Sequence, residues 1–333
     1  MRLGVAGCGR IAERGYVPAV LAAEAVTVAG FADPDAARLE SCRALWERSG
    51  GGDAVAVATV AELLDTPLDL LVVAVPAAHH LAVAEKAAAA GVPCLVEKPP
   101  APDLAEAEKL AALDPPPYLA FNRRFLQGAA LRDEIPATGW LELDLELRFR
   151  REDWGAHESR DEALLDAGIH LIDLACHLSG SSPIAVRAAE IAPERASLEL
   201  ELSRGRARIR CATDRRHREE VTVRDRAGKL LGRSEWGGLR SRLTALAGRP
   251  DPLALSLQRQ LKALHTPTTA PELHQLLRPA EVEVDAVRRS VAASGIATAS
   301  DGVAAMAVVE AARRSAELGG AEVTVSPTAE VRP

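Results

Sequence analysis

The chain of 333 residues is longer than most compact domains, so its length alone predicts two domains. Its hydrophobic content of 48% and charged content of 26% exclude a wholly disordered chain. A net charge of −7 and an aromatic content of 3% argue against a nucleic-acid partner, because such a surface needs basic side chains and stacking rings.

The sequence also carries signals about location and thiol chemistry. Its longest apolar run, around residues 70–75, is far shorter than the ~20 residues that cross a bilayer. The amino terminus enters a strand-like pattern without the layout of a signal peptide. The five cysteines are scattered and form no CxxC pair, which favours neither a disulfide framework nor a cysteine zinc site. We therefore expect a cytoplasmic protein with reduced thiols and no membrane partner.

Up to about residue 120, short β-branched runs alternate with longer alanine-rich stretches. The predicted strands are 2–6, 26–32, 70–75 and 92–96, and the predicted helices are 16–23, 35–48 and 80–90. Continuous apolar strands separated by helices indicate a parallel sheet that is covered on both faces, with right-handed crossovers. Three consecutive prolines at 115–117 end this pattern before a short edge strand at 118–121.

The remainder of the chain has strands in which apolar and charged side chains alternate. Such strands are predicted at 141–149, 197–211 and 219–225, with helices at 162–178, 258–264 and 302–318. We thus expect an α/β Rossmann domain, a doubly wound parallel sheet, over residues 1–120. Residues 121–333 should form an α+β domain with a largely antiparallel open sheet, for substrate binding and oligomerisation. An open sheet has a face to bury, so a homodimer or homotetramer is expected.

A glycine motif lies between the first predicted strand and the first helix. Gly7 permits a tight turn, Gly9 lets the backbone approach a pyrophosphate at the helix N-terminus, and Ala12 takes the place of a third glycine. Asp33 closes the second strand at the spacing of an acid that binds the adenosine ribose and repels a 2′-phosphate. The motif predicts NAD(H) binding. The nearby Arg38 could instead favour NADP(H), although a solvated arginine on a helix face is the commoner interpretation.

A lysine follows the last strand of this first half. Lys98 comes directly after residues 92–96, and the carboxyl ends of parallel strands face the crevice where doubly wound sheets bind ligands. On its own, this position is more typical of a surface lysine at the exit of a strand.

Four polar residues form one stripe on the predicted helix 162–178. Asp166, His170, Asp173 and His177 are related by offsets of four, seven and eleven, and apolar residues cover the rest of that helix. Buried polar side chains of this kind need water or partners. Carboxylates on either side of His170 can orient its ring and tune its pKa for acid–base chemistry. Three of the four could instead ligate a metal, but no further cluster completes such a site, so no metal is predicted.

Taken in order, these motifs resemble those of the Gfo/Idh/MocA oxidoreductases, which include inositol dehydrogenase and glucose–fructose oxidoreductase. The resemblance covers almost the full chain. It rests on Gly7-x-Gly9-x-x-Ala12, Asp33-Pro34-Asp35, Pro76 with His80, Glu97-Lys98-Pro99, Asn122-Arg123-Arg124-Phe125, Asp166-xxx-His170 and Ser300-Asp301-Gly302.

The resemblance implies roles for the matching positions. Lys98 would bond the reacting hydroxyl and relay a proton, His170 would be the general acid/base, and Asp166 would position the substrate and support His170. The cofactor-binding residues expected in all are Gly7, Gly9, Arg10, Ile11, Asp33, Arg38, Val75, Pro76, His80, Glu97 and Asn122. Further substrate contacts are expected from Lys98, Arg124 and Asp173, although Asp173 could instead only hold the register of its helix. His177 is expected to be structural.

One departure from the family concerns residues 160–162. Relatives carry glycines before the Asp-xxx-His element, whereas this chain has Arg160-Asp161-Glu162. Arg160 is therefore a further candidate substrate contact, since a guanidinium can hold an anionic group in a bidentate manner. A solvated charge at the rim is the commoner interpretation of such an arginine.

We expect hydride transfer between nicotinamide C4 and a secondary alcohol or ketone of a small molecule, namely a sugar, a sugar derivative or a cyclitol. NAD is the expected cofactor and NADP the alternative. Two other functions remain open. One is a non-catalytic dinucleotide sensor or scaffold, and the other is an enzyme that retains NAD and cleaves a glycosidic bond through transient oxidation. A zinc hydrolase built on the His170 helix is a more distant alternative.

Overall fold

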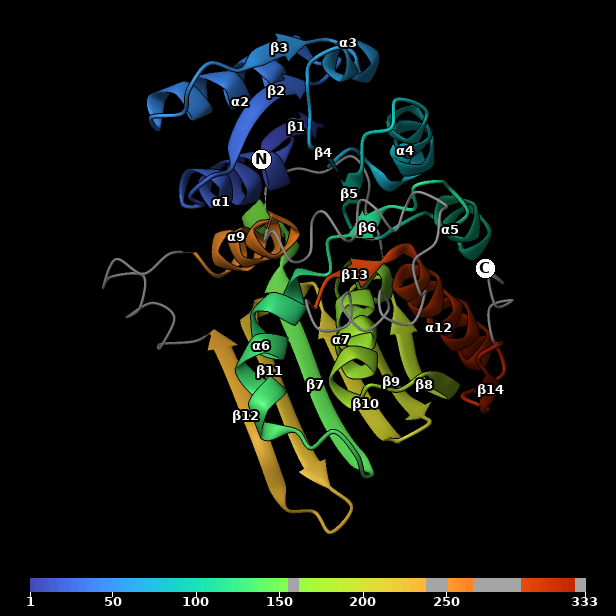
Figure 1. Cartoon of the computed structure of the whole chain (residues 1–333). Coiled ribbons are helices and arrows are strands. Elements are labelled where there is room, and N and C mark those ends of the chain that lie inside the picture. The colour runs from blue at the N-terminus through green and yellow to red at the C-terminus, as the bar shows by residue number, and fades with distance from the viewer. Residues whose placement is uncertain (155–161, 238–250, 266–294, 327–333) are drawn as a thin grey trace, which may run out of the picture. The chain divides into compact units, whose positions relative to one another are not determined.

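The computed structural model describes residues 1–154, 162–237, 251–265 and 295–326 (Figure 1). The chain forms two compact units. The first unit comprises Met1–Asn122 and Asp251–Ser300, and the second comprises Arg123–Pro250 and Asp301–Pro333. Within the described ranges, no helix combines the length and the hydropathy of a membrane span.

The first unit contains a seven-stranded sheet in the order β13-β6-β5-β4-β1-β2-β3. Its strands are β1 (Arg2–Ala6), β2 (Thr27–Ala32), β3 (Val55–Val57), β4 (Leu70–Val73), β5 (Cys94–Val96), β6 (Tyr118–Leu119) and β13 (Ala297–Thr298). The first six pair in parallel, and only β13 is antiparallel to its neighbour. The order 3-2-1-4-5-6 is that of a doubly wound Rossmann sheet, as the sequence predicted.

Helices connect the parallel strands of this unit. They are α1 (Val17–Leu21), α2 (Ala36–Arg48), α3 (Val60–Leu64), α4 (His80–Ala89) and α5 (Leu104–Ala111), and α9 (Pro252–His265) joins them from a later part of the chain. Local chemistry fixes their starts: Asp35 accepts hydrogen bonds from the first turn of α2, and Thr59 and Glu62 form a capping box at α3. The strands are apolar throughout because helices exclude water from the sheet, and Leu3, Val5 and Leu71 are fully buried.

Two expectations for the first unit were wrong in detail. Strand β6 is not an edge strand, because β13 pairs along its outer side. Residues 251–300 group with the first unit, whereas the sequence placed all of 121–333 in a second domain. The cause is visible at α9: Leu257 packs within 2.8 Å of where a Cβ on Gly15 would lie, and Gln260 Nε2 donates to Leu119 O at 2.8 Å. Short strand β3 and helix α3 were also missed.

The second unit contains another seven-stranded sheet, in the order β12-β11-β7-β10-β9-β8-β14. Its strands are β7 (Leu141–Arg150), β8 (Pro183–Ala192), β9 (Arg195–Leu202), β10 (Gly205–Ala212), β11 (Asp214–Asp225), β12 (Leu230–Gly237) and β14 (Val323–Thr324). Only β7 and β10 are parallel neighbours. The prediction of a largely antiparallel open sheet is confirmed, although the strand expected at 197–211 is a hairpin of β9 and β10.

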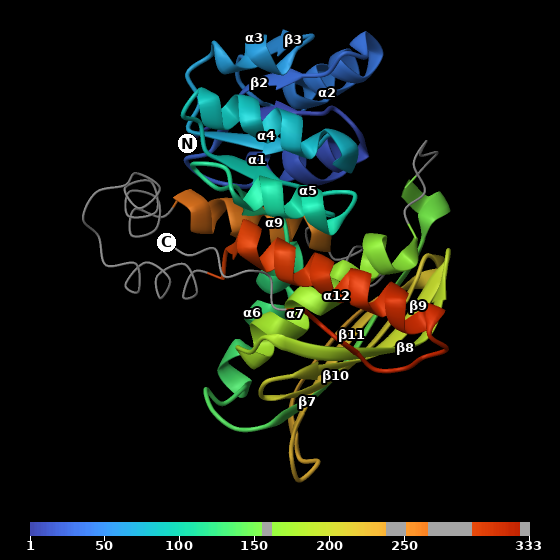
Figure 2. The ribbon, with the colours of Figure 1, turned by 90° about the vertical axis from the view of Figure 1, so that its right-hand side faces the viewer.

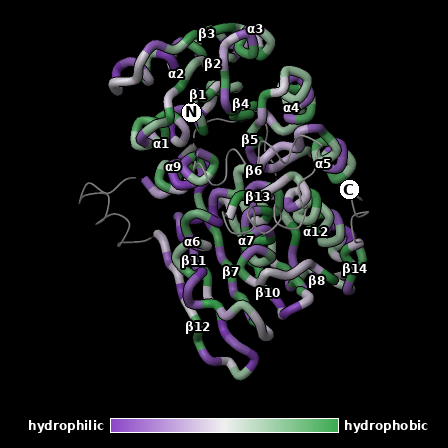
Figure 3. Tube along the Cα trace, viewed as in Figure 1, coloured by the Kyte–Doolittle hydropathy of each residue, from purple (hydrophilic) through white to green (hydrophobic). Residues whose placement is uncertain are grey.

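Hydrophobic and hydrophilic residues alternate along the strands of the second sheet (Figure 3). One face packs against α6 (Gln127–Leu131), α7 (Ile169–Ser179) and α12 (Ala299–Glu317), of which α7 and α12 are clear in Figure 2. The other face carries cross-strand ion pairs: Glu142 lies 2.7 Å from Arg206, and Arg224 lies 3.1 Å from Asp144. We expected an open sheet with a face to bury. This face is charged, and assembly through it stays a prediction.

Candidate active site

The glycine turn after β1 has two glycines that are needed for different reasons. Gly7 has a φ of +97°, and a Cβ there would lie 2.5 Å from Ala74 O, so the fold itself requires glycine. A Cβ on Gly9 would meet nothing within 4 Å. Because the fold does not require Gly9, the open space beside it is the feature that fits a phosphate group lying close to the backbone.

Asp33 is held by the backbone of the glycine turn and by the backbone at the start of α2. Its side chain is only 8% exposed, and its carboxylate accepts hydrogen bonds of 2.8 Å from Cys8 N and from Asp35 N. Each carboxylate oxygen has a second lone pair, so Asp33 retains the capacity to accept ribose hydroxyls. Arg38 is exposed in the first turn of α2, where it pairs with Asp35 at 3.4 Å.

The helix that follows the glycine turn begins irregularly. Arg10 is exposed and lies 3.7 Å from Glu13, and Ile11 is half-buried. Residues Ala12–Tyr16 form a π-helical turn before α1. Such turns are frequent at functional sites. The expected contacts of Arg10 and Ile11 with a cofactor stay predictions.

The turn that carries Lys98 is held by a buried carboxylate. Glu97 is 7% exposed; its Oε1 accepts a hydrogen bond of 2.8 Å from the Tyr16 hydroxyl, and its Oε2 accepts one of 3.1 Å from Lys98 N. Burial raises the pKa of Tyr16 well above its ordinary value, and the negative charge of Glu97 adds to the rise. Lys98 itself is half-buried at the carboxyl end of β5. Sequence reasoning missed Tyr16, because a tyrosine in an apolar helix gives no signal of a distant partner.

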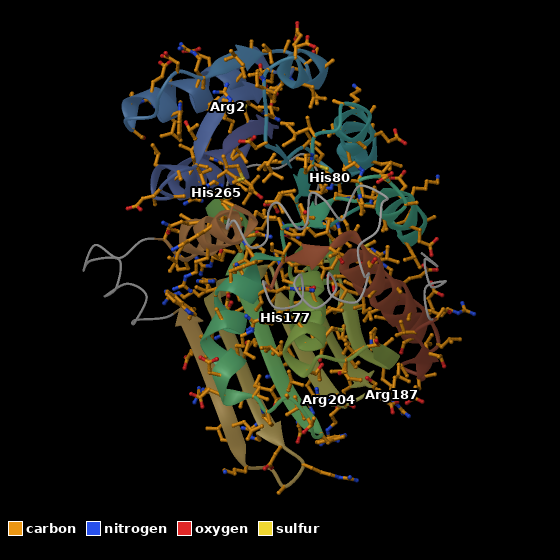
Figure 4. All side chains as sticks on the ribbon, in the orientation of Figure 1. Arg2, His80, His177, Arg187, Arg204 and His265 are labelled. Atoms are coloured by element: carbon orange, nitrogen blue, oxygen red, sulfur yellow. The ribbon has the colours of Figure 1, made fainter. Side chains whose placement is uncertain are left out.

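His80 fastens the far side of the same turn. The ring, labelled in Figure 4, is only 1% exposed, with Nε2 2.8 Å from Val75 O and Nδ1 3.2 Å from Pro100 O. Burial lowers the pKa of His80. His80 therefore joins the loop after β4 to the loop after Lys98, and direct contact with a cofactor stays a prediction.

The other expected cofactor residues of the first unit differ in exposure. Val75 is half-buried and Pro76 is exposed, so both present surface at the carboxyl end of β4. Asn122 is 4% exposed and is the last residue of the first segment of this unit, Met1–Asn122. Their contacts with a cofactor also stay predictions.

In the second unit, Arg124 anchors α7 through a buried ion pair. Arg124 Nε donates to Asp173 Oδ2 at 2.9 Å, and its Nη2 lies 3.2 Å from Asp301 Oδ1. Burial raises the pKa of Asp173 to about 6, because the charge of Arg124 offsets only part of the cost of desolvation. Both residues were expected to contact substrate. The structure pairs them with each other, at 7% and 2% exposure, and their contact with a substrate stays a prediction.

The neighbouring arginine holds a strand rather than a helix. Arg123 lies 2.7 Å from Glu219 Oε1 on β11, and the same carboxylate accepts hydrogen bonds from Gln127 and His217. Burial alone would raise the pKa of Glu219, but the Arg123 charge brings it below its ordinary value. This cluster could not be predicted from the sequence, since its members are up to 96 positions apart, from 123 to 219.

Asp166 and His170 lie at the start of the α7 region. Asp166 sits in a second π-helical turn, Leu164–Gly168, and its Oδ2 accepts a hydrogen bond of 3.1 Å from Arg151 Nη2. His170 is 5% exposed in the first turn of α7. Thus both acids of the predicted stripe, Asp166 and Asp173, have an arginine partner, which meets the requirement that buried charge be paired. Arg160 lies outside the described residues.

His177 is the last member of the stripe and has a packing role. Its Cδ2 lies 3.4 Å from where a Cβ on Gly128 would be, so it fills the space between α7 and α6 (Figure 4). Burial lowers its pKa to about 3, and the nearby arginine charges add to the shift. In the part of the chain that the structure describes, no group of three His, Cys, Asp or Glu side chains could hold a metal ion.

The doubly wound sheet, the glycine turn and the anchored Asp33 together define a dinucleotide-binding Rossmann protein. Residues 1–114 match the family model described as "Oxidoreductase family, NAD-binding Rossmann fold", that of GFO_IDH_MocA. Over residues 1–114 the chain is therefore similar to the NAD-binding domain of the Gfo/Idh/MocA oxidoreductases, as the motifs predicted.

Individual relatives agree with this assignment. The chain is 30% identical over 208 residues to inositol 2-dehydrogenase of Leifsonia xyli, which is 59% of this chain and 60% of that protein. The curated relatives are thus matched over about three fifths of their length.

Solved structures share the fold over nearly the whole chain. A myo-inositol dehydrogenase from Corynebacterium glutamicum has a TM-score of 0.69 at 19% identity, covering 98% of this chain and 99% of its own. A myo-inositol dehydrogenase from Lactobacillus casei, in complex with NAD(H) and myo-inositol, has a TM-score of 0.70 at 16% identity, covering 100% and 98%. At these identities the likeness concerns the fold.

Proposed function

We propose that the protein is an NAD-dependent dehydrogenase or reductase that acts on a secondary alcohol or ketone of a sugar, a sugar derivative or a cyclitol. One observation carries the proposal: three loops are tied together at the carboxyl edge of the first sheet. Gly7 packs on Ala74, and His80 links Val75 to Pro100, beside Lys98. A doubly wound sheet binds its ligand at this edge.

The residues of the first unit suit NAD(H). The space beside Gly9 would admit the pyrophosphate, and the remaining lone pairs of Asp33 would accept the adenosine ribose hydroxyls. A 2′-phosphate would place like charge against Asp33, and Arg38 is already paired with Asp35. NAD is therefore proposed over NADP. The bound nicotinamide would supply the hydride acceptor or donor.

The proton and charge chemistry would come from this chain. The Lys98 ammonium would stabilise negative charge that develops on the substrate oxygen. His170 would exchange the hydroxyl proton, directly or through Lys98, and Asp166 would position the substrate and support His170. Each such group contributes roughly 10²–10⁴ to rate in enzymes of this kind.

The substrate class follows the relatives, of which several are inositol dehydrogenases. Ring polyols are therefore the first compounds to test. A cytoplasmic location and a homodimer or homotetramer are proposed alongside, from the sequence and the resemblance alone.

The test is a screen of polyols and sugars, myo-inositol included, with NAD and with NADP, followed by substitution of Lys98. We expect Lys98→Ala to lower kcat by roughly 10²–10⁴ while the NADH dissociation constant changes less than about twofold. Near-native turnover in Lys98→Ala would contradict the assigned role. Tight NADH binding without turnover on the whole panel would contradict the enzyme itself and favour a sensor.

A further inference from the structure

The Tyr16 hydroxyl is a buried polar group that has no part in the proposed reaction but lies next to the Lys98 turn. Tyr16 belongs to the π-helical turn that follows the glycine turn, and its side chain is 1% exposed. The hydroxyl donates to Glu97 Oε1 at 2.8 Å, and the other oxygen of that carboxylate accepts from Lys98 N at 3.1 Å. A single carboxylate thus connects the helix of the glycine turn to the backbone of Lys98.

Burial of the Tyr16 hydroxyl and the Glu97 carboxylate costs free energy, so filling space is a poor explanation for a tyrosine at this position. Phenylalanine would fill nearly the same volume as Tyr16 without bringing a hydroxyl out of water beside a charged group. A hydroxyl that donates to a carboxylate forms a stronger hydrogen bond than a neutral pair does. What the hydroxyl adds over a phenyl ring is a fixed orientation of Glu97, and through it a fixed backbone at Lys98.

The rest of the turn is already restrained. Glu97 N donates to Val73 O at 3.0 Å, and Pro100 O lies 3.2 Å from the buried ring of His80. Between these two points, the contact of the Lys98 amide with Glu97 Oε2 sets where the lysine leaves the strand. The orientation of Glu97 therefore bears directly on the position of the Lys98 amide.

We propose that Tyr16 is a positioning residue for Lys98: by holding Glu97, its hydroxyl fixes the catalytic lysine relative to the turn that receives the cofactor pyrophosphate. The inference rests on the proposed function for its catalytic consequence. Its structural consequence, the restraint on the Lys98 amide, can be measured without any substrate.

The matched variants are Tyr16→Phe and Tyr118→Phe, because the chain has two tyrosines and both lie buried in the first unit. Tyr118 is on β6, and burial raises the pKa of its hydroxyl to about 12. Each variant loses one buried hydroxyl. Only Tyr16→Phe loses a donor to Glu97.

The first measurement is amide hydrogen exchange with ¹⁵N-lysine labelling. The chain has five lysines, so the spectrum is sparse, and the signal absent from Lys98→Ala identifies the amide of interest. We expect Tyr16→Phe to speed exchange at Lys98 about tenfold, with the other four lysines unchanged and with no effect of Tyr118→Phe. Unchanged exchange at Lys98 in Tyr16→Phe would overturn the proposal, and so would equal acceleration at all five lysines.

The second measurement is steady-state kinetics on the substrate that the screen identifies. We expect Tyr16→Phe to lower kcat about tenfold, where kcat is calculated per NADH-binding site. The NADH dissociation constant should change less than about twofold, because small misplacements of a catalytic group slow the chemical step. A kcat within twofold of the parent would overturn the catalytic consequence. If Lys98→Ala itself keeps its turnover, the proposed function fails instead, so the two failures are distinguishable.

Discussion

The two units hold their candidate functional residues by different means. In the first unit, backbone groups hold Asp33 and His80: two N–H groups donate to Asp33, and two carbonyl oxygens face the ring of His80. In the second unit, arginine side chains pair with Asp166, Asp173 and Glu219. The glycine turn and Asp33 leave a signature in the sequence, because a dinucleotide-binding motif fixes their residue types and approximate spacing. Ion pairs demand only opposite charges that meet in space, so they leave none.

The largest expected effect would come from breaking the buried pair of the second unit. Arg124→Ala leaves the Asp173 carboxylate buried without its guanidinium, so we expect the free energy of unfolding to fall by about 3–5 kcal/mol. The matched control is Arg206→Ala, since that arginine is 51% exposed in its pair with Glu142 and should cost at most about 1 kcal/mol. Urea unfolding of the whole chain measures both. Equal losses would mean that burial does not distinguish the two pairs.

The glycine turn offers the corresponding experiment in the first unit. Gly7→Ala places a methyl group 2.5 Å from Ala74 O at a φ of +97°, and we expect a loss of about 2–4 kcal/mol. Gly9→Ala meets no atom, so stability should change by less than about 0.5 kcal/mol. NADH affinity should nevertheless fall at least about tenfold, because the methyl group occupies the space where the phosphates approach. Thermal unfolding with NADH titration tests the pair, and unaltered affinity in Gly9→Ala would remove the phosphate argument.

The smallest effect is a dependence of stability on pH that belongs to the second unit. His177 has its pKa lowered from 6.5 to about 3, so the unfolded chain takes up a proton in a range of pH where the folded chain does not. Stability is therefore fully present above pH 6.5 and is lost as the pH falls, by at most about 1.4 kcal/mol per pH unit.

We expect His177→Gln to reduce the loss between pH 6.5 and about 4 by about 1–2 kcal/mol, because His177 is only partly buried. His79→Gln, at an exposed histidine of the first unit, is the control. Denaturant midpoints across that range supply the data. A variant with the same acid sensitivity as the parent would show that other groups dominate.

The same contrast explains what the sequence could and could not predict. The fold class, the parallel strands and the positions of Gly7, Gly9 and Asp33 were predictable, because apolar runs and glycine spacing are local patterns. The hairpin within 197–211 was missed because the apolar–charged alternation continues through its turn.

The partners of the site residues were not predictable. Nothing in the sequence joins Tyr16 to Glu97 or Arg124 to Asp173, since each pair is separated by dozens of residues and depends on the finished fold. The stripe on the α7 region was correctly singled out as needing partners, but its chemistry required the structure. The motifs therefore identified the candidate site residues, whereas the contacts that hold those residues became known only from the structure.

Helix α9 and strand β13 carry a consequence for synthesis of the protein. Both complete the first unit, yet they come after most of the second unit in the chain. During translation, the surface around Gly15 must wait for α9, and the outer side of β6 must wait until residues near 298 have left the ribosome. The domain that begins the polypeptide is thus among the last parts to be finished, and a nascent chain halted midway would display an unpaired strand edge to its neighbours.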